Sequence, residues 1–78
     1  MNMTKAELRE TAQMALKSEY GFAPKKSDIV LLEWFGDGTY IMFSVNGNQY
    51  QFHSKIFNNG FVTCGVFVGK GTITKFGE

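Results

Sequence analysis

Apolar positions near the N-terminus follow a helical spacing. Thr4 and Glu7 have the spacing of a capping box, and Gly21 suits the left-handed position that follows a last helical turn. Charged and polar residues fill the other faces of the segment. The pattern predicts one amphipathic helix over about residues 4–20, with this apolar stripe: Leu8, Ala12, Ala15, Leu16 and Tyr20.

From about residue 28 the pattern changes to alternating apolar and polar positions, rich in β-branched and aromatic residues. Such segments favour strands. Turn signals divide the region at Asp37-Gly38, Asn46-Gly47 and Gly69-Lys70-Gly71. The sequence therefore predicts an α+β fold, in which the helix packs on an antiparallel β-meander of four to five strands over about residues 28–76.

The Asn46-Gly47 pair also predicts which strand residues face each other. A two-residue type I′ turn there pairs Tyr40 with His53 and Phe43 with Tyr50. The same reasoning at Asp37-Gly38 gives four more pairs: Phe35 with Tyr40, Trp34 with Ile41, Glu33 with Met42, and Leu32 with Phe43. Both turns indicate one inner face, which we expect the helix to cover: Val30, Leu32, Trp34, Ile41, Phe43, Val45, Tyr50 and Phe52.

The opposite face of the predicted sheet has an unusual composition. Its expected members are Leu31, Glu33, Phe35, Tyr40, Met42, Ser44, Gln49, Gln51 and His53. Rings, a methionine and amides with little charge are typical of the centre of a protein interface. We therefore expect this face to bind a partner, with five contact residues: Phe35, Tyr40, Met42, Gln51 and His53.

The remainder of the predicted sheet is less strongly specified. Residues 54–61 are expected to form a loop with Ile56 and Phe57 turned inward, and an alternative is that this loop covers the outer face. Residues 61–68 are expected to form a fourth strand, and TITKF, residues 72–76, a fifth. Gly65 within the fourth strand allows a bend, so a curled, partly closed small barrel is the alternative architecture.

Candidate catalytic and metal-binding residues are sparse. His53 is the only histidine and Cys64 the only cysteine, so neither a multi-histidine site nor a cysteine pair is available. GVFVGKGT, residues 65–72, has only three residues between its first two glycines and Gly71 before Thr72, unlike a phosphate-binding P-loop. We therefore expect no enzyme activity, cofactor or metal ion.

Length and charge limit the function further. The 78 residues allow a single domain, and a chain of this size buries only about 60–65% of its unfolded surface, so a partner would add to its stability. The net charge is +1. With charged residues near the start and no long apolar run, we expect a cytoplasmic protein that does not enter a membrane.

These observations lead to three hypotheses about function. The first is a small protein-interaction module that uses the outer face of its sheet, either for another protein or for a homodimer. In size and architecture the chain also resembles the small accessory proteins of phages and other mobile elements, many of which bind and inhibit a host protein, although no motif carries this resemblance. An inhibitor of a host protein is therefore the second hypothesis. The third is weak binding of single-stranded nucleic acid by stacking on Phe35, Tyr40 and His53.

Overall fold

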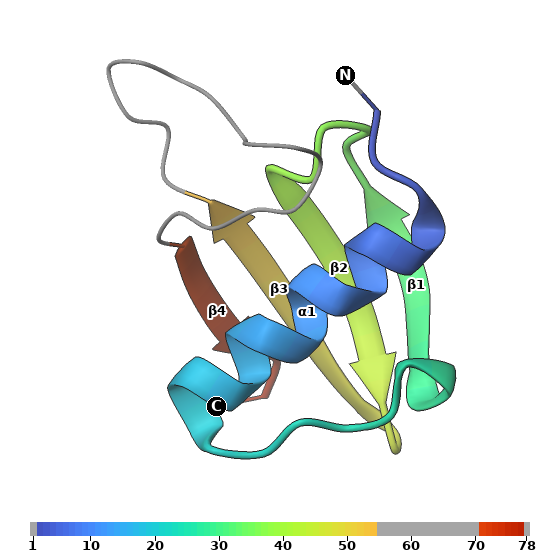
Figure 1. The fold of residues 1–78 in the computed structure, drawn as a ribbon. Coiled ribbons are helices and arrows are strands. Elements are labelled where there is room, and N and C mark those ends of the chain that lie inside the picture. Colours follow the sequence, from blue (N-terminus) through green and yellow to red (C-terminus); the bar gives the residue numbers. More distant parts are fainter. Residues whose placement is uncertain (1, 55–70, 78) are drawn as a thin grey trace.

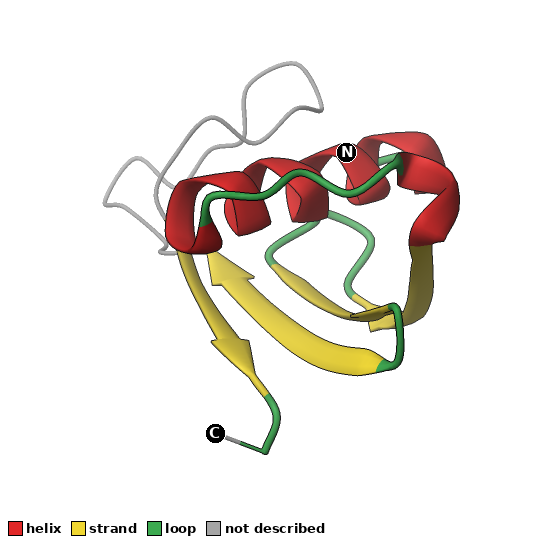
Figure 2. Cartoon of the chain, turned by 90° about the horizontal axis from the view of Figure 1, so that it is seen from below, coloured by secondary structure: helices red, strands yellow, loops and turns green. Residues whose placement is uncertain are grey.

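The computed structural model describes residues 2–54 and 71–77. In chain order the elements are helix α1 (Lys5–Tyr20), the 3-10 helix η1 (Lys26–Asp28) and strands β1 (Ile29–Trp34), β2 (Tyr40–Val45), β3 (Asn48–Ser54) and β4 (Gly71–Lys75). The strands form one antiparallel sheet in the order β1-β2-β3-β4, and α1 crosses one face of it (Figures 1 and 2). The predicted α+β fold is confirmed. The sheet is open, so the barrel alternative is wrong.

Both ends of α1 are formed as the sequence predicts. Thr4 Oγ1 accepts a hydrogen bond from the backbone N–H of Glu7 at 3.1 Å, and Glu7 Oε1 accepts one from the backbone N–H of Thr4 at 2.8 Å. Gly21 has a φ of 80° and donates its N–H to the carbonyl of Lys17 at 3.1 Å. Because these bonds satisfy backbone groups that a helix end leaves unpaired, the helix begins and ends where local chemistry dictates.

The hydrophobic core lies between α1 and the sheet. Leu8, Ala12 and Leu16 are fully buried on the helix side, as predicted, and the buried Thr11 donates its hydroxyl to the carbonyl of Glu7. Burying a leucine contributes about 1.5–3 kcal/mol, so this stripe holds the helix on the sheet. The buried hydrophobic residues of the described part of the chain are Met3, Leu8, Ala12, Leu16, Ile29, Ile41, Phe43, Val45, Tyr50 and Phe52.

The β2–β3 hairpin has the predicted register. Tyr40 pairs with His53, and Phe43 pairs with Tyr50. Asn46 and Gly47 have φ values of 51° and 83°, and positive φ at both central residues is what a type I′ turn requires. This register directs Phe43 and Tyr50 toward the helix, where their rings stack with centroids 5.5 Å apart.

Strand β1 departs from the prediction at a β-bulge. Glu33 pairs with Met42 and Trp34 with Ile41, as expected, but Leu31 rather than Leu32 lies opposite Phe43. Leu32 is an extra residue in the strand, so the residues before it face the opposite side of the sheet from the one predicted. Leu31 is therefore half-buried against the core, whereas the predicted inner residues Val30 and Leu32 are 53% and 47% exposed. The predictions for these three residues were wrong.

The predicted fifth strand is present as β4, and it pairs directly with β3. Phe52 lies opposite Ile73, and His53 lies opposite Thr72. The expected fourth strand, with Cys64 and Gly65, lies outside the described residues. The expected loop at residues 54–61 was wrong at Ser54, which ends β3, and its other residues lie outside the described ones.

The N-terminal segment packs against the β1–β2 loop and is hydrogen-bonded to it. The backbone N–H of Met3 donates to the carbonyl of Gly36 at 2.7 Å, and the Met3 side chain is only 8% exposed. Its sulfur occupies the position that a Cβ atom at Gly38 would need. Gly38 also has a φ of 80°, so two independent constraints favour glycine there.

Replacing Gly38 with alanine should therefore destabilise the protein more than replacing Gly47. Gly47 has a φ of 83° and no atom within 4 Å of the added Cβ, so Gly47→Ala incurs only the backbone cost of roughly 1–2 kcal/mol. Gly38→Ala adds the displacement of Met3. Urea unfolding measures both, and in a Met3→Ala background the cost of Gly38→Ala should fall to that of Gly47→Ala. Equal costs in the wild-type background would contradict the steric argument.

Candidate protein-interaction surface

The face of the sheet opposite α1 is not covered by any element of the described residues (Figure 2). We call it the outer face. Register and exposure assign these residues to it: Val30, Leu32, Glu33, Phe35, Tyr40, Met42, Ser44, Gln49, Gln51, His53, Thr72 and Thr74. All five residues predicted as contacts are among them.

Three rings of the outer face form a continuous row from Phe35, the residue after β1, to Tyr40 on β2 and His53 on β3. The Phe35 and Tyr40 ring centroids are 5.2 Å apart, and those of Tyr40 and His53 are 5.0 Å apart, with tilted planes in both pairs. The backbone N–H of Phe35 donates to the carbonyl of Tyr40 at 2.9 Å, which fixes the start of the row. Because Tyr40 and His53 stand on paired strands and Phe35 is bonded to the backbone of Tyr40, the row is held by the sheet.

The turn before Tyr40 is fixed by a side chain. Asp37 Oδ1 accepts hydrogen bonds from the backbone N–H of Thr39 at 3.0 Å and from its hydroxyl at 2.7 Å. Both bonds favour the ionised carboxylate and lower the pKa of Asp37 below its usual value. This local geometry directs the chain into β2 and places Tyr40 at its first position.

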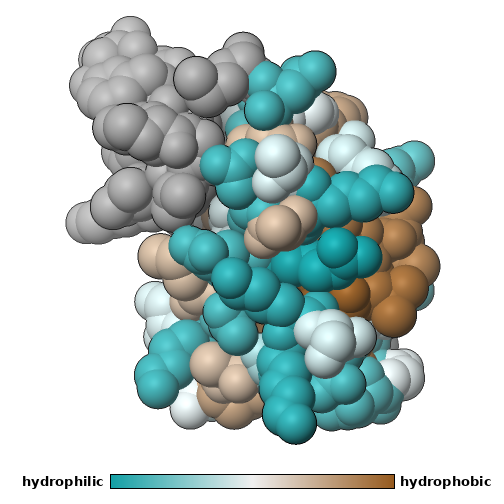
Figure 3. Space-filling model, turned by 45° about the vertical axis from the view of Figure 1, so that its right-hand side comes forward, coloured by the Kyte–Doolittle hydropathy of each residue, from teal (hydrophilic) through white to brown (hydrophobic). Residues whose placement is uncertain are grey.

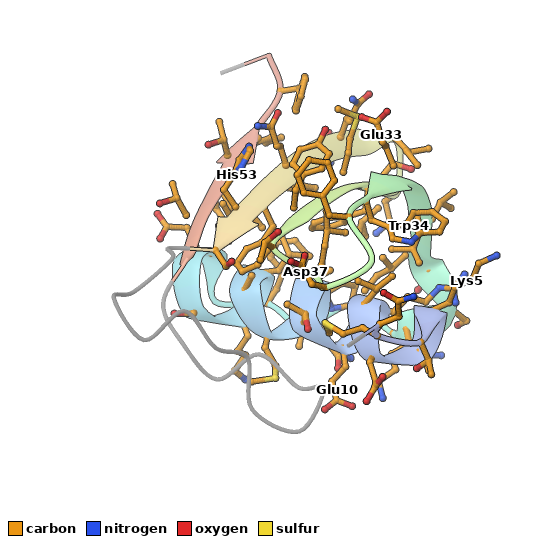
Figure 4. All side chains as sticks on the ribbon, turned by 90° about the horizontal axis from the view of Figure 1, so that it is seen from above. Lys5, Glu10, Glu33, Trp34, Asp37 and His53 are labelled. Atoms are coloured by element: carbon orange, nitrogen blue, oxygen red, sulfur yellow. The ribbon has the colours of Figure 1, made fainter. Side chains whose placement is uncertain are left out.

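Glu33 provides a negative charge beside the ring row. The Tyr40 hydroxyl donates to Glu33 Oε1 at 3.2 Å. Partial desolvation of the phenol, the hydrogen bond to Glu33 and the charge of Glu33 together raise the pKa of Tyr40 above 10.0. Figure 4 shows Glu33 and His53 on the side of the sheet opposite the helix.

The amides and the methionine make contacts within the outer face. The Gln49 amide nitrogen lies 3.2 Å from Met42 Sδ, and the Gln51 amide nitrogen contacts Nε2 of His53. Met42 and Gln51 are half-buried, and His53 is exposed. These contacts orient side chains that would otherwise rotate freely, which lowers the entropic cost of binding a partner.

An apolar area along β1 extends the predicted surface. Val30, Leu32 and Phe35 are 53%, 47% and 59% exposed, and hydrophobic surface gathers on the β1 side of the molecule in Figure 3. The sequence did not indicate that Val30 and Leu32 face outward, because Val30, Leu31 and Leu32 are all apolar. Alternation alone therefore gives no signal of a bulge among them.

Positive charges are absent from the outer face within the described residues. Lys75 pairs with Tyr50, which faces the helix, and Lys5 lies over the ring of Trp34 at 5.7 Å from its centroid. The described residues also contain no group of three or more histidine, cysteine, aspartate or glutamate side chains that could hold a metal ion. Aromatic contact and hydrogen bonding are the chemistry that this surface offers.

A shallow pocket lies elsewhere, between α1 and η1. Ala6, Arg9, Lys26 and Ser27 line its volume of about 250 Å³. Its two cations are already engaged: Arg9 Nε donates to the carbonyl of Ile29 at 3.1 Å, and Lys26 forms an ion pair with Glu10 at 3.1 Å. Both cations therefore help to hold α1 against η1 and β1.

Comparisons with known proteins identify no relative of this chain. No protein-family model matches the chain, and no curated protein or solved structure matches it. Within the described residues, no helix has the length and apolar character needed to cross a membrane. The described residues form a small α+β domain in which α1 covers one face of the sheet and no described element covers the other.

Removing the charge of Glu33 should lower the pKa of Tyr40. In Glu33→Gln the carboxylate no longer disfavours the phenolate, so the pKa should move down toward 10.0. The raised pKa stabilises the fold below pH 10, and this contribution is lost as the pH rises through the folded-state value. Desolvation of the phenol persists in the variant, so Glu33→Gln should lose only the part of this alkaline dependence that Glu33 contributes. NMR titration of the Tyr40 ring measures the shift. Glu19→Gln, on the exposed part of α1, is the matched control, and equal Tyr40 values in both variants would contradict the assignment.

Proposed function

We propose that the protein is a non-enzymatic protein-interaction module whose contact surface is the outer face of its sheet. Phe35, Tyr40, Met42, Gln51 and His53 form the contact surface, and Val30 and Leu32 extend it. The observation that supports this most directly is the ring row on paired strands, with no described element over it. Uncovered apolar and aromatic areas on small domains mark interaction sites.

The composition of the outer face favours a protein partner over nucleic acid. Rings, methionine and aliphatic side chains with few charges are enriched where protein interfaces are fully buried. Single-strand binders instead surround their stacking rings with lysine and arginine. Among the described residues of the outer face, the charged partner of a ring is Glu33, which would repel phosphates. Binding of single-stranded nucleic acid is therefore the less supported alternative.

Two kinds of partner fit this proposal. A second copy of the chain would form a homodimer and enlarge a small core. A host protein would fit the role of an accessory protein from a phage or mobile element, which would inhibit its target by occupying one of the target's surfaces. Both use the same outer face, so the same substitutions test them.

Charged substitutions in the ring row should abolish association without unfolding the protein. Tyr40→Lys and Phe35→Glu place a charge where a partner must exclude water, which costs several kcal/mol in a buried interface. Ser18→Lys, on the exposed face of α1, is the matched control and should bind normally. Light scattering over a dilution series measures self-association, affinity capture from cell extract measures other partners, and circular dichroism checks the fold.

The outcomes of this experiment are distinct. A wild-type dimer that Tyr40→Lys splits into folded monomers identifies self-association. A wild-type monomer that captures a protein, when Tyr40→Lys does not, identifies a different partner. Unfolding of both ring variants would instead show that the row belongs to the core, and unchanged association in both would refute the proposal.

A further inference from the structure

We infer that the partner's contact segment is a protein segment with an arginine, which binds Glu33 and stacks on the rings of Phe35 and Tyr40. This inference rests on the proposed function and adds the chemistry of the partner. Glu33 is the only carboxylate on the outer face, and that face has no lysine or arginine among the described residues.

Any partner that covers Tyr40 also removes water from Glu33, because the two side chains are hydrogen-bonded at 3.2 Å. A carboxylate buried without a cation is strongly destabilising for an interface. The Tyr40 hydroxyl donates to Glu33 Oε1, and a carboxylate can accept several hydrogen bonds over its two oxygens. Glu33 therefore has capacity for further donors, and the best complement is a cation that donates hydrogen bonds.

Arginine suits this place better than lysine. Its planar guanidinium stacks on aromatic faces and donates in a fork to a carboxylate, whereas lysine offers a compact and strongly hydrated charge. Phe35 and Tyr40, 5.2 Å apart, provide the rings beside Glu33. Val30 and Leu32 on β1 provide apolar contact for the residues that flank the arginine in the partner.

A second copy of the chain does not supply this group readily. Arg9 is the only arginine in the sequence. It is half-buried on the helix side of the molecule, and its Nε donates to the carbonyl of Ile29 at 3.1 Å. Because it lies on the side opposite the outer face, Arg9 cannot reach Glu33 of a second copy when two outer faces pair. The charge of Glu33 therefore favours a different protein as the occupant.

A random peptide library tests this chemistry without knowledge of the natural partner. The library is selected on the full chain, and peptides that also bind Tyr40→Lys are removed. Arginine should be enriched next to apolar residues in the remaining peptides. In a synthetic binder, replacing that arginine with citrulline should weaken binding by about tenfold or more, since charge-assisted hydrogen bonds are lost. Lysine in the same place should restore only part of the affinity.

Variants of the chain provide the matched test. Glu33→Gln should weaken binding of the arginine peptide by about tenfold and leave binding of its citrulline form unaffected. Glu19→Gln should change the binding of neither peptide. Selection on Glu33→Lys should enrich acidic peptides in place of arginine. Circular dichroism confirms that each variant is folded.

Each contrary result separates the inference from the proposed function. Tyr40-dependent peptides without enriched arginine would overturn the inference and leave the interaction surface in place. So would a wild-type dimer that Tyr40→Lys splits, because the occupant would then be a second copy. A monomeric chain that yields no Tyr40-dependent peptide would overturn both.

Discussion

The β-bulge in β1 is the constraint on which the two faces of the sheet depend. One extra residue, Leu32, lies between the pairs Leu31–Phe43 and Glu33–Met42. Because side chains alternate along a strand, a single insertion exchanges inside and outside for everything before it. It directs Ile29 and Leu31 toward the core and leaves Val30 and Leu32 on the outer face, beside the ring row.

Among the described residues, α1 covers one face of the sheet and leaves the other exposed. Its buried stripe, with Leu8, Ala12 and Leu16, shares one core with inner side chains of β1, β2 and β3. No second helix in the described residues does the same on the other side (Figure 1). A sheet with one helix buries one face, and the second face then carries side chains suited either to water or to a partner.

The outer face combines aromatic contact with a single charge. Glu33 accepts a hydrogen bond from Tyr40, and its charge contributes to the raised pKa of that phenol. A neutral ring row would accept many apolar partners with little selection among them. A carboxylate that must be paired when water leaves adds specificity, because partners without a suitable cation pay its desolvation.

The sequence by itself determined the local parts of this protein. The caps of α1 depend on Thr4, Glu7 and Gly21, and the β2–β3 register depends on Asn46 and Gly47, all through contacts between near neighbours in the chain. That register alone places Tyr40, Met42, Gln51 and His53 on one face.

Only the tertiary structure decided the face of Val30 and Leu32 and the direct pairing of β3 with β4. In the apolar run Val30-Leu31-Leu32, either alternation buries hydrophobic side chains, so the local pattern has no preference. Packing under α1 makes the choice by burying Ile29 and Leu31. The β3–β4 pairing joins residues far apart in the sequence, and turn chemistry cannot specify it because no short turn connects the two strands.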